Sequence, residues 1–227
     1  MLRYIKQARS ALSLLSPDEV RQRAERPLAV GLVAVDNAAY ADMEDFLIPA
    51  AVSHDKRMQV MQSVHRACDP DIPERYDLVL YEQGLPCPAT AFTFFREDPG
   101  RTVEEIVRAR DDLGLALARN FYPFRKPVVD RIITSVAREN AIFAVASALP
   151  NVVPSFLEVP WAIGEFASDT AFITMNQVRM AFLVAAASDK QVGYDKQLAE
   201  LIRLRRAPSA GARWRASWWD LSRWVAG

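Results

Sequence analysis

Residues 139–188 read ENAIFAVASALPNVVPSFLEVPWAIGEFASDTAFITMNQVRMAFLVAAAS. This stretch is almost entirely apolar, yet its second half retains Glu165, Asp169, Asn176 and Arg179. If residues 160–188 form one helix, these side chains fall within roughly 80° of one another at about 100° per residue. The sequence therefore predicts a single polar stripe along an otherwise apolar helix.

A helix that crossed a membrane alone would have to place the three charges of this stripe in lipid. Each charge near the centre of a spanning helix costs about 2.5 to 3.5 kcal/mol, or roughly 8 to 10 kcal/mol together. The apolar side chains of the same helix return only some 2 to 5 kcal/mol. We therefore expect the stripe to be paired against another helix or to have its charges near the membrane interface.

The expected partner is the helical segment at residues 130–149, which carries Arg138, Glu139 and Asn140 before an apolar run. That run of about ten residues is too short to cross a bilayer. The two segments predict a helical hairpin with small residues at the contact and polar groups turned inward. Two environments remain open for it: a membrane, and an ordinary helical bundle in water with a satisfied polar network.

The first 125 residues have a different pattern, in which strand-like and helical segments alternate. Such alternation predicts an α/β layer with a small, mostly parallel sheet, whereas only helices are expected from Pro127 onward. The expected strands are residues 28–35, 76–82 and 89–95, and the expected helices are residues 16–26, 38–50, 55–68 and 101–121. Ser16 is the expected N-cap of the first helix.

The segment after the first expected strand is where a P-loop protein carries its glycine-rich turn and its Lys-Ser/Thr pair. This chain has neither, since Gly31 lies within the strand and no glycine follows. The carboxylates of Asp36, Asp42, Glu44 and Asp45 would also repel a phosphate. The segment is therefore P-loop-like in position only, and we expect no bound nucleotide cofactor.

Composition excludes several functions. The chain has 28 basic and 28 acidic residues, so it lacks the positive charge expected of a nucleic-acid-binding protein. Two cysteines are too few for a disulfide framework and suit a reducing compartment. The first residues lack a long apolar run and a cleavage pattern, so we expect no secretory signal and a location in the cytoplasm or on its membrane face.

Candidate catalytic and metal-binding residues are few. His65 and Cys68 have a spacing that a zinc site uses, but the favoured interpretation is a pair of surface histidines and two structural thiols. The sequence contains no Gly-x-Ser-x-Gly elbow and no His-Glu-x-x-His motif. We therefore predict no catalytic residues and no metal ligands.

The stretches SVARENAIFAVASALPNVVP (135–154) and FASDTAFITMNQVRMAFLVAAASDKQVGY (166–194) resemble the bacterial YcjF-like family, a domain of unknown function often attached to Era-like GTPase domains. The resemblance covers about residues 127–200 and includes a Thr-x-x-Gln-x-Arg-Met pattern. It implies association with the inner membrane and with a GTPase-like partner. The family-like residues are Arg138, Glu139, Asn140, Thr174, Gln177, Arg179 and Met180.

After Leu201 the chain reads IRLRRAPSAGARWRASWWDLSRWVAG, which holds four of the five tryptophans. A basic and aromatic segment of this kind suits lipid headgroups. A second interpretation is a one-base frame change near residues 202–206, because GC-rich codons for this tail can be chosen so that the neighbouring frame encodes a helix-like sequence. Both interpretations remain open.

These patterns predict three parts: an α/β domain without a nucleotide motif at 1–125, a helical domain at 126–201, and an irregular tail at 202–227. The favoured function is that of a non-enzymatic, membrane-associated adaptor with a protein partner. The alternatives are a GTPase-type regulator with a degenerate nucleotide site and a soluble helical scaffold. The sequence does not determine the oligomeric state.

Overall fold

The computed structural model describes residues 16–67, 75–148, 169–194, 196 and 197. Glu165, Cys68 and the tail at 202–227 therefore lie outside the described residues. The chain divides into two compact units. Of the described residues, 16–21, 129–148, 169–186 and those from 191 onward belong to the helical unit, and 22–67, 75–128 and 187–190 belong to the α/β unit.

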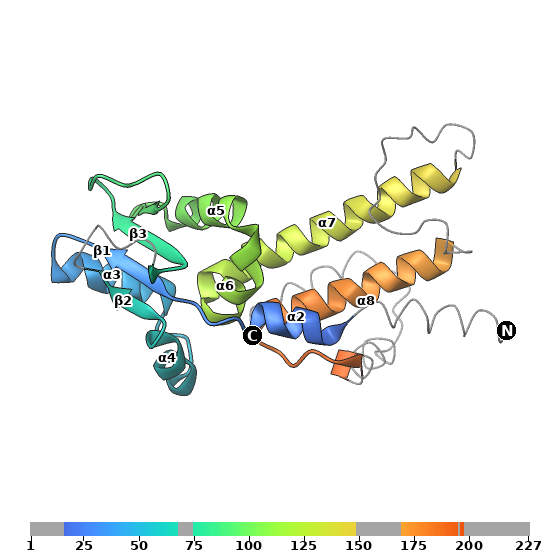
Figure 1. The fold of residues 1–227 in the computed structure, drawn as a ribbon, viewed down its shortest axis with the longest axis horizontal. Coiled ribbons are helices and arrows are strands. Elements are labelled where there is room, and N and C mark those ends of the chain that lie inside the picture. The colour runs from blue at the N-terminus through green and yellow to red at the C-terminus, as the bar shows by residue number, and fades with distance from the viewer. Residues whose placement is uncertain (1–15, 68–74, 149–168, 195, 198–227) are drawn as a thin grey trace. The chain divides into compact units, whose positions relative to one another are not determined.

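The α/β unit is built on a four-stranded sheet with the order β2-β1-β3-β4 (Figure 1). The strands are β1 (Val30–Val33), β2 (Val64–Arg66), β3 (Leu78–Glu82) and β4 (Phe92–Phe94). All three strand pairs are parallel, with Val30 opposite both Val64 and Leu78. The prediction of a small parallel sheet followed by helices is confirmed.

Apolar side chains of the strands and helices form the core of this unit. Helix α3 (Asn37–Leu47) buries Met43 and Leu47, and α5 (Pro99–Ala109) buries Val103 and Ile106. Burying one such aliphatic side chain contributes about 1.5 to 3 kcal/mol. The strands add Val30, Leu32, Leu78, Leu80 and Phe94 to the core.

The first turns of α3 and α5 are both closed by an aspartate. Asp36 accepts a hydrogen bond from the Ala39 amide at 2.8 Å, and Asp98 accepts one from the Arg101 amide at 3.3 Å. An N-cap carboxylate satisfies an amide that has no partner within the helix and favours the positive end of the helix dipole. These aspartates therefore determine where the two helices begin.

Gly31 allows a close contact in the middle of the sheet. A Cβ atom at this position would lie 2.8 Å from Cδ2 of the Tyr76 ring. Because real Cβ atoms do not approach a ring so closely, the aromatic ring and this residue fit together only as long as the residue is glycine. The glycine thus allows the Tyr76 ring to pack against β1.

Two predicted helices are shorter than expected. Residues 55–68 were expected to be one helix, but α4 (His54–Met61) ends before β2 begins. The Val30 amide donates to the Ser63 carbonyl and the Ala67 amide donates to the Leu32 carbonyl, each at 2.7 Å. The prediction was wrong because pairing with β1 decides the conformation of residues 64–66, which local propensity leaves open.

The expected helix at 101–121 is likewise interrupted. Helix α5 ends at Ala109, a short 3₁₀ turn covers Asp111–Leu113, and α6 (Gly114–Asn120) follows. The Arg110 side chain turns away to bond the Asp112 carboxylate at 3.0 Å and the Asp77 carbonyl at 2.6 Å. These contacts hold the chain at the break.

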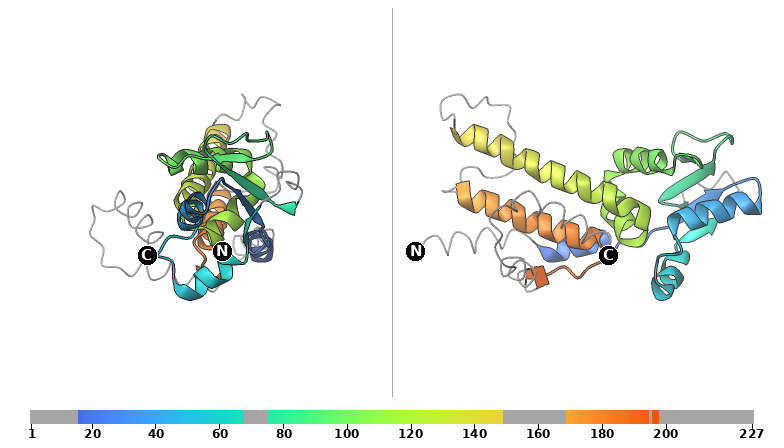
Figure 2. Two further views of the ribbon diagram at one scale, coloured as in Figure 1. Left: turned by 90° about the vertical axis from the view of Figure 1, so that its left-hand side faces the viewer. Right: turned by 180° about the vertical axis from the view of Figure 1, so that it is seen from behind.

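Helices α7 (Tyr122–Ala148) and α8 (Asp169–Ala187), most of whose residues belong to the helical unit, lie side by side, in yellow and orange (Figures 1 and 2). Helix α7 begins earlier than the expected start at Pro127 and continues through that proline. Helix α2 (Pro17–Ala24) begins as predicted, because the Ser16 hydroxyl accepts from the Glu19 amide at 3.3 Å. Residues 122–148 and 169–187 are helical, whereas residues 188–193 form a turn and an irregular segment.

Candidate functional site

The facing sides of α7 and α8 carry two polar contacts. The Asn176 side-chain amide donates to Oδ1 of Asn140 at 2.9 Å. One helical turn further along α8, the Arg179 guanidinium lies 3.0 Å from the Glu139 carboxylate. We call Glu139, Asn140, Asn176 and Arg179 the polar layer of the helical unit.

The two contacts of the polar layer differ in burial. Asn176 is only 1% exposed, so its amide depends on a partner within the protein. The side chains of Arg179 and Glu139 remain 38% and 37% exposed, which leaves their charges partly solvated. The amide pair therefore carries the larger penalty if it is broken, whereas the ion pair is a modest contact.

Aromatic side chains continue the contact along the helices. The rings of Phe143 and Phe172 stack at a centroid distance of 3.9 Å with an interplanar angle of 16°. The Phe182 ring meets Tyr194 edge-on at 5.1 Å. Stacked and edge-on pairs each add about 0.5 to 1.5 kcal/mol beyond the area they bury. The stack of Phe143 on Phe172 thus adds an apolar contact between α7 and α8 to those of the polar layer.

The residues of the expected stripe do not all join this layer. Asn176 and Arg179 do, and they meet Glu139 and Asn140 of the expected partner helix. Glu165 lies outside the described residues, and so does the side chain of Asp169 at the start of α8. The described partner of Arg179 is consequently a residue of α7 and not one of its own stripe.

The family-like residues fall on two faces of the helices. Thr174, Gln177 and Arg138 are exposed, and Met180 is half-buried. Asn140, Glu139 and Arg179 instead lie at the contact between α7 and α8. The pattern Thr-x-x-Gln-x-Arg-Met therefore combines an inward-facing arginine with an outward-facing threonine and glutamine.

A second candidate site lies at the carboxyl ends of β1 and β3. In open parallel sheets, ligands bind where the strand order reverses, which is between these two strands here. Only Ala34, Val35 and Asp36 separate β1 from α3. The Val35 amide donates to Oε2 of Glu82 at 2.8 Å. The Glu82 carboxylate thus accepts a hydrogen bond from the Val35 amide. In a phosphate-binding loop, such an amide would donate to the ligand.

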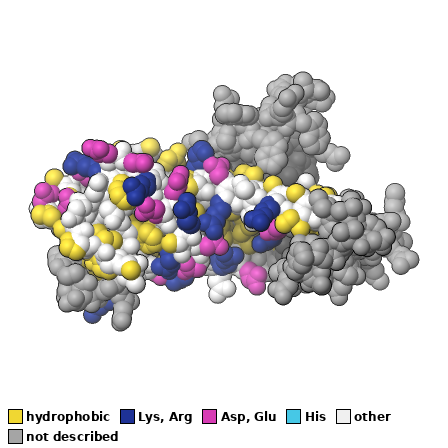
Figure 3. Space-filling view, turned by 90° about the horizontal axis from the view of Figure 1, so that it is seen from above, with side chains coloured by type: hydrophobic (Ala, Val, Ile, Leu, Met, Phe, Trp, Pro, Cys, Tyr) yellow, Lys and Arg dark blue, Asp and Glu magenta, His cyan; other side chains and the backbone are white. Residues whose placement is uncertain are grey.

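Nearby carboxylates are engaged in ion pairs with arginines. Arg66 binds Glu44 at 2.8 and 3.1 Å, and this hydrogen bonding raises the pKa of its guanidinium. Arg96 lies 2.6 Å from Asp42. The carboxylates expected to repel a phosphate are therefore partly neutralised. On the face drawn in Figure 3, basic and acidic side chains are likewise interspersed.

Metal-ligating side chains do not gather in the described part of the chain. There, no group of three or more His, Cys, Asp or Glu residues is arranged to hold a metal ion. His65 is exposed, with its ring 5.8 Å from that of Tyr76, and Cys87 is a half-buried free thiol. The His65–Cys68 interpretation is not tested, because Cys68 lies outside the described residues.

Two polar features of the α/β unit were not expected from the sequence. One is the bond between Glu82 and the Val35 amide, which joins residues 47 apart. The other is Thr102, whose buried hydroxyl accepts from the Phe95 amide at 2.9 Å and donates to the Thr93 carbonyl at 3.2 Å. A threonine three residues after the proline that begins a helix is only a weak sequence signal for such a buried hydroxyl. No sequence signal marks the contact of Glu82.

Among the residues that the structure describes, no helix has the length and apolar character needed to cross a membrane. Comparison with known proteins gives no match to a family model, to a curated protein or to a solved structure.

Proposed function

We propose that this protein is a non-enzymatic adaptor, whose α/β unit binds a protein partner and whose helical unit associates with a membrane surface on its cytoplasmic side. The observation that carries the proposal is the connection between β1 and α3. It is a short loop without glycine, and its Val35 amide is occupied by Glu82. Such a loop cannot wrap a phosphate with several free amides, as a P-loop does.

The surface at the same place supports binding of a protein. Val35 is 75% exposed at the position where the strand order reverses, beside the exposed Asp36. An exposed apolar side chain next to carboxylates suits a protein surface with apolar and basic groups better than it suits an anion. The resemblance of residues 127–200 to the YcjF-like family makes a GTPase-type protein our candidate partner.

Charge pairing in the helical unit supports membrane association. Between residues 170 and 187, the sequence has one charged side chain, Arg179, and it is paired with Glu139. Pairing reduces the free-energy cost of bringing this apolar helix close to lipid. Because the described helices do not span a bilayer, we propose attachment at the surface.

Flotation of the full chain with liposomes tests this attachment. The vesicles would contain phosphatidylcholine alone or mixed with phosphatidylglycerol. We expect the protein to float with the mixed vesicles and to be released by a carbonate wash. Protein that stays at the bottom with both vesicle types would support the soluble scaffold instead, and flotation that survives carbonate would mean insertion of the helices.

The strand order favours one second candidate, a GTPase-type regulator with a degenerate site. The order β2-β1-β3-β4 matches the start of a doubly wound nucleotide-binding sheet. Calorimetric titration of the full chain with GTP and Mg²⁺ separates the two functions, and we expect no binding. Micromolar affinity would favour the GTPase-type regulator over the adaptor. A P-loop-like role of the connection between β1 and α3 belongs only to the second candidate, the GTPase-type regulator.

A further inference from the structure

The segment that follows α8 is held by charge at an unusual backbone conformation. Asp189 has a φ of 57°, which lies in the left-handed region. Helices often end with such a residue, but it is usually glycine, because a side chain in this conformation costs about 1 kcal/mol. The presence of aspartate indicates that its side chain contributes something glycine cannot.

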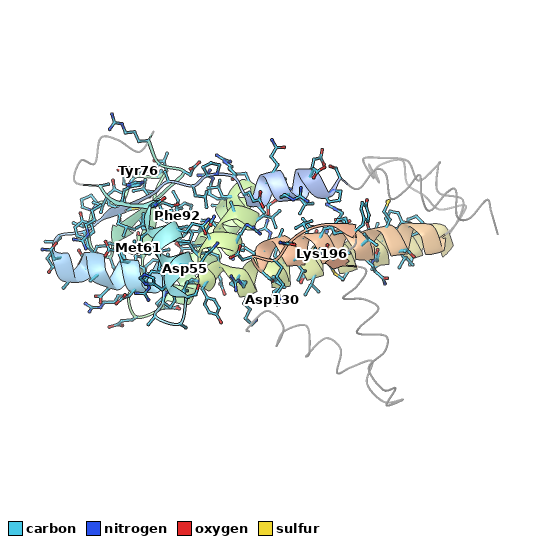
Figure 4. The ribbon with its side chains drawn as sticks, turned by 90° about the horizontal axis from the view of Figure 1, so that it is seen from below. Asp55, Met61, Tyr76, Phe92, Asp130 and Lys196 are labelled. Carbon is cyan, nitrogen blue, oxygen red and sulfur yellow. The ribbon has the colours of Figure 1, made fainter. Side chains whose placement is uncertain are left out.

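The Asp189 carboxylate contacts a cation with each of its oxygens. Nζ of Lys56 lies 2.9 Å from Oδ2, and Nε of Arg119 lies 3.5 Å from Oδ1. The three side chains are between 17% and 28% exposed, so water screens these contacts less than it screens a surface pair. Lys56 belongs to α4, near whose ends Asp55 and Met61 are labelled in Figure 4.

Arg119 of α6 extends the contact to the neighbouring backbone. Its guanidinium donates to the Lys190 carbonyl at 3.3 Å and lies 3.3 Å from the Glu25 carboxylate. The adjoining Ala187 and Ser188 are 0% and 6% exposed. Residues 187–190 are thus packed in the α/β unit, although the residues before and after them belong to the helical unit.

We propose that Asp189 is an electrostatic latch, which fixes residues 187–190 to α4 and α6 and releases them when its charge is screened or removed. The bridging carboxylate compensates for the cost of the left-handed backbone. Because these contacts are ion pairs, high ionic strength weakens the attachment of residues 187–190, while the apolar cores of both units remain folded. This device is independent of the proposed adaptor function.

Hydrogen exchange of the backbone amides at 187–190, followed by mass spectrometry of the full chain, tests the latch. Asp189→Asn keeps the size of the side chain and tolerates the left-handed conformation, but it removes the charge. We expect exchange to become about fivefold faster, which corresponds to about 1 kcal/mol for a partly buried ion pair. Wild-type protein in about 1 M NaCl, where the screening length is about 3 Å, should also exchange faster, but by less than Asp189→Asn, because salt screens partly buried contacts less.

Asp45→Asn is the matched control, because it removes an exposed carboxylate elsewhere in the α/β unit. It should leave the exchange of residues 187–190 unchanged. Lys56→Met gives a second measurement should the Asp189 variant fail to fold, and the same acceleration is expected.

Asp189→Gly separates charge from backbone conformation. Glycine relieves the left-handed conformation, so a merely conformational role predicts protection equal to or greater than that of the wild type. Unchanged protection in Asp189→Gly and Asp189→Asn would overturn the latch, as would insensitivity of the wild type to salt. Faster exchange in both variants is the expected result.

Discussion

Thr102 in the α/β unit and Asn176 in the helical unit are both buried polar side chains, but their partners differ in kind. The Thr102 hydroxyl bonds backbone groups that lie 7 and 9 residues away. The Asn176 amide bonds another side chain that lies 36 residues away. The first contact follows from the local path of the chain, whereas the second exists only if α7 and α8 pair in the observed alignment.

This difference has an energetic consequence. The Thr102 hydroxyl bonds the carbonyl of Thr93 in β4 and the amide of Phe95 directly after this strand. Those backbone groups cannot be removed by mutation, so loss of the buried hydroxyl takes one hydrogen bond from each of them. The partner of Asn176 is the side chain of Asn140. Replacing both asparagines with apolar residues therefore leaves no buried polar group without a hydrogen bond at this place.

The largest effect is therefore expected for Thr102→Val, which keeps the shape and removes the hydroxyl. We expect a loss of about 2 to 3 kcal/mol in the free energy of unfolding, measured by urea denaturation. Thr102→Ser retains the hydroxyl and should lose distinctly less. Equal stability of the valine and serine variants would show that the hydroxyl bonds contribute nothing.

Asn176→Leu tests the long-range contact. It leaves the Asn140 amide facing an apolar side chain, which should cost about 1 to 2 kcal/mol. The double variant with Asn140→Leu should recover most of this loss, and Gln177→Ala on the exposed face of α8 is the control. If the double variant is less stable than the single one, the two amides are not an isolated pair and the comparison with Thr102 fails.

Asp36→Ala tests a contact that is both local and exposed. The cap of α3 is lost, and we expect a destabilisation of about 1 kcal/mol by thermal denaturation. Asp36→Ser keeps a capping oxygen and should remain close to the wild type. A larger loss in the serine variant than in the alanine variant would contradict the capping role.

A smaller effect is expected for Arg179→Met. The Arg179–Glu139 pair is more than one-third exposed, so its contribution should stay below about 1 kcal/mol and decrease with added salt. A double-mutant cycle with Glu139→Gln measures it. If the coupling free energy of Arg179 and Glu139 exceeds that of Asn140 and Asn176, the ion pair, and not the amide pair, holds the two helices in alignment.

The smallest expected effect concerns pH. Hydrogen bonding to Arg110 lowers the pKa of the Asp112 carboxylate below its usual value. A carboxylate with a lowered pKa in the folded state stabilises the protein above its unfolded pKa and loses that contribution as the pH falls through the folded pKa. In Asp112→Asn, the free energy of unfolding should therefore decrease slightly less than in the wild type as the pH falls through the acid range. A larger decrease in the free energy of unfolding at acid pH in this variant would mean that another group causes the pH dependence.

Local signals in the sequence predicted a large part of the α/β unit. The apolar run at 28–35 contains β1, and Ser16 begins α2 as its capping pattern indicates. The same reasoning failed for β2, because residues 64–66 become a strand only beside β1. It also missed the break after Ala109, where Arg110 is held by the Asp77 carbonyl, 33 residues away.

The sequence by itself determined the class of structure and the residues available for the polar layer. Helical periodicity placed Asn176 and Arg179 on one stripe, and the apolar surroundings required a partner for them. Only the tertiary structure decided which residues those partners are, namely Asn140 and Glu139. It also decided that Glu82 bonds the Val35 amide and that Asp189 meets Lys56 and Arg119. Periodicity is a property of neighbouring residues, whereas these contacts depend on where the packing of apolar surfaces brings distant segments together.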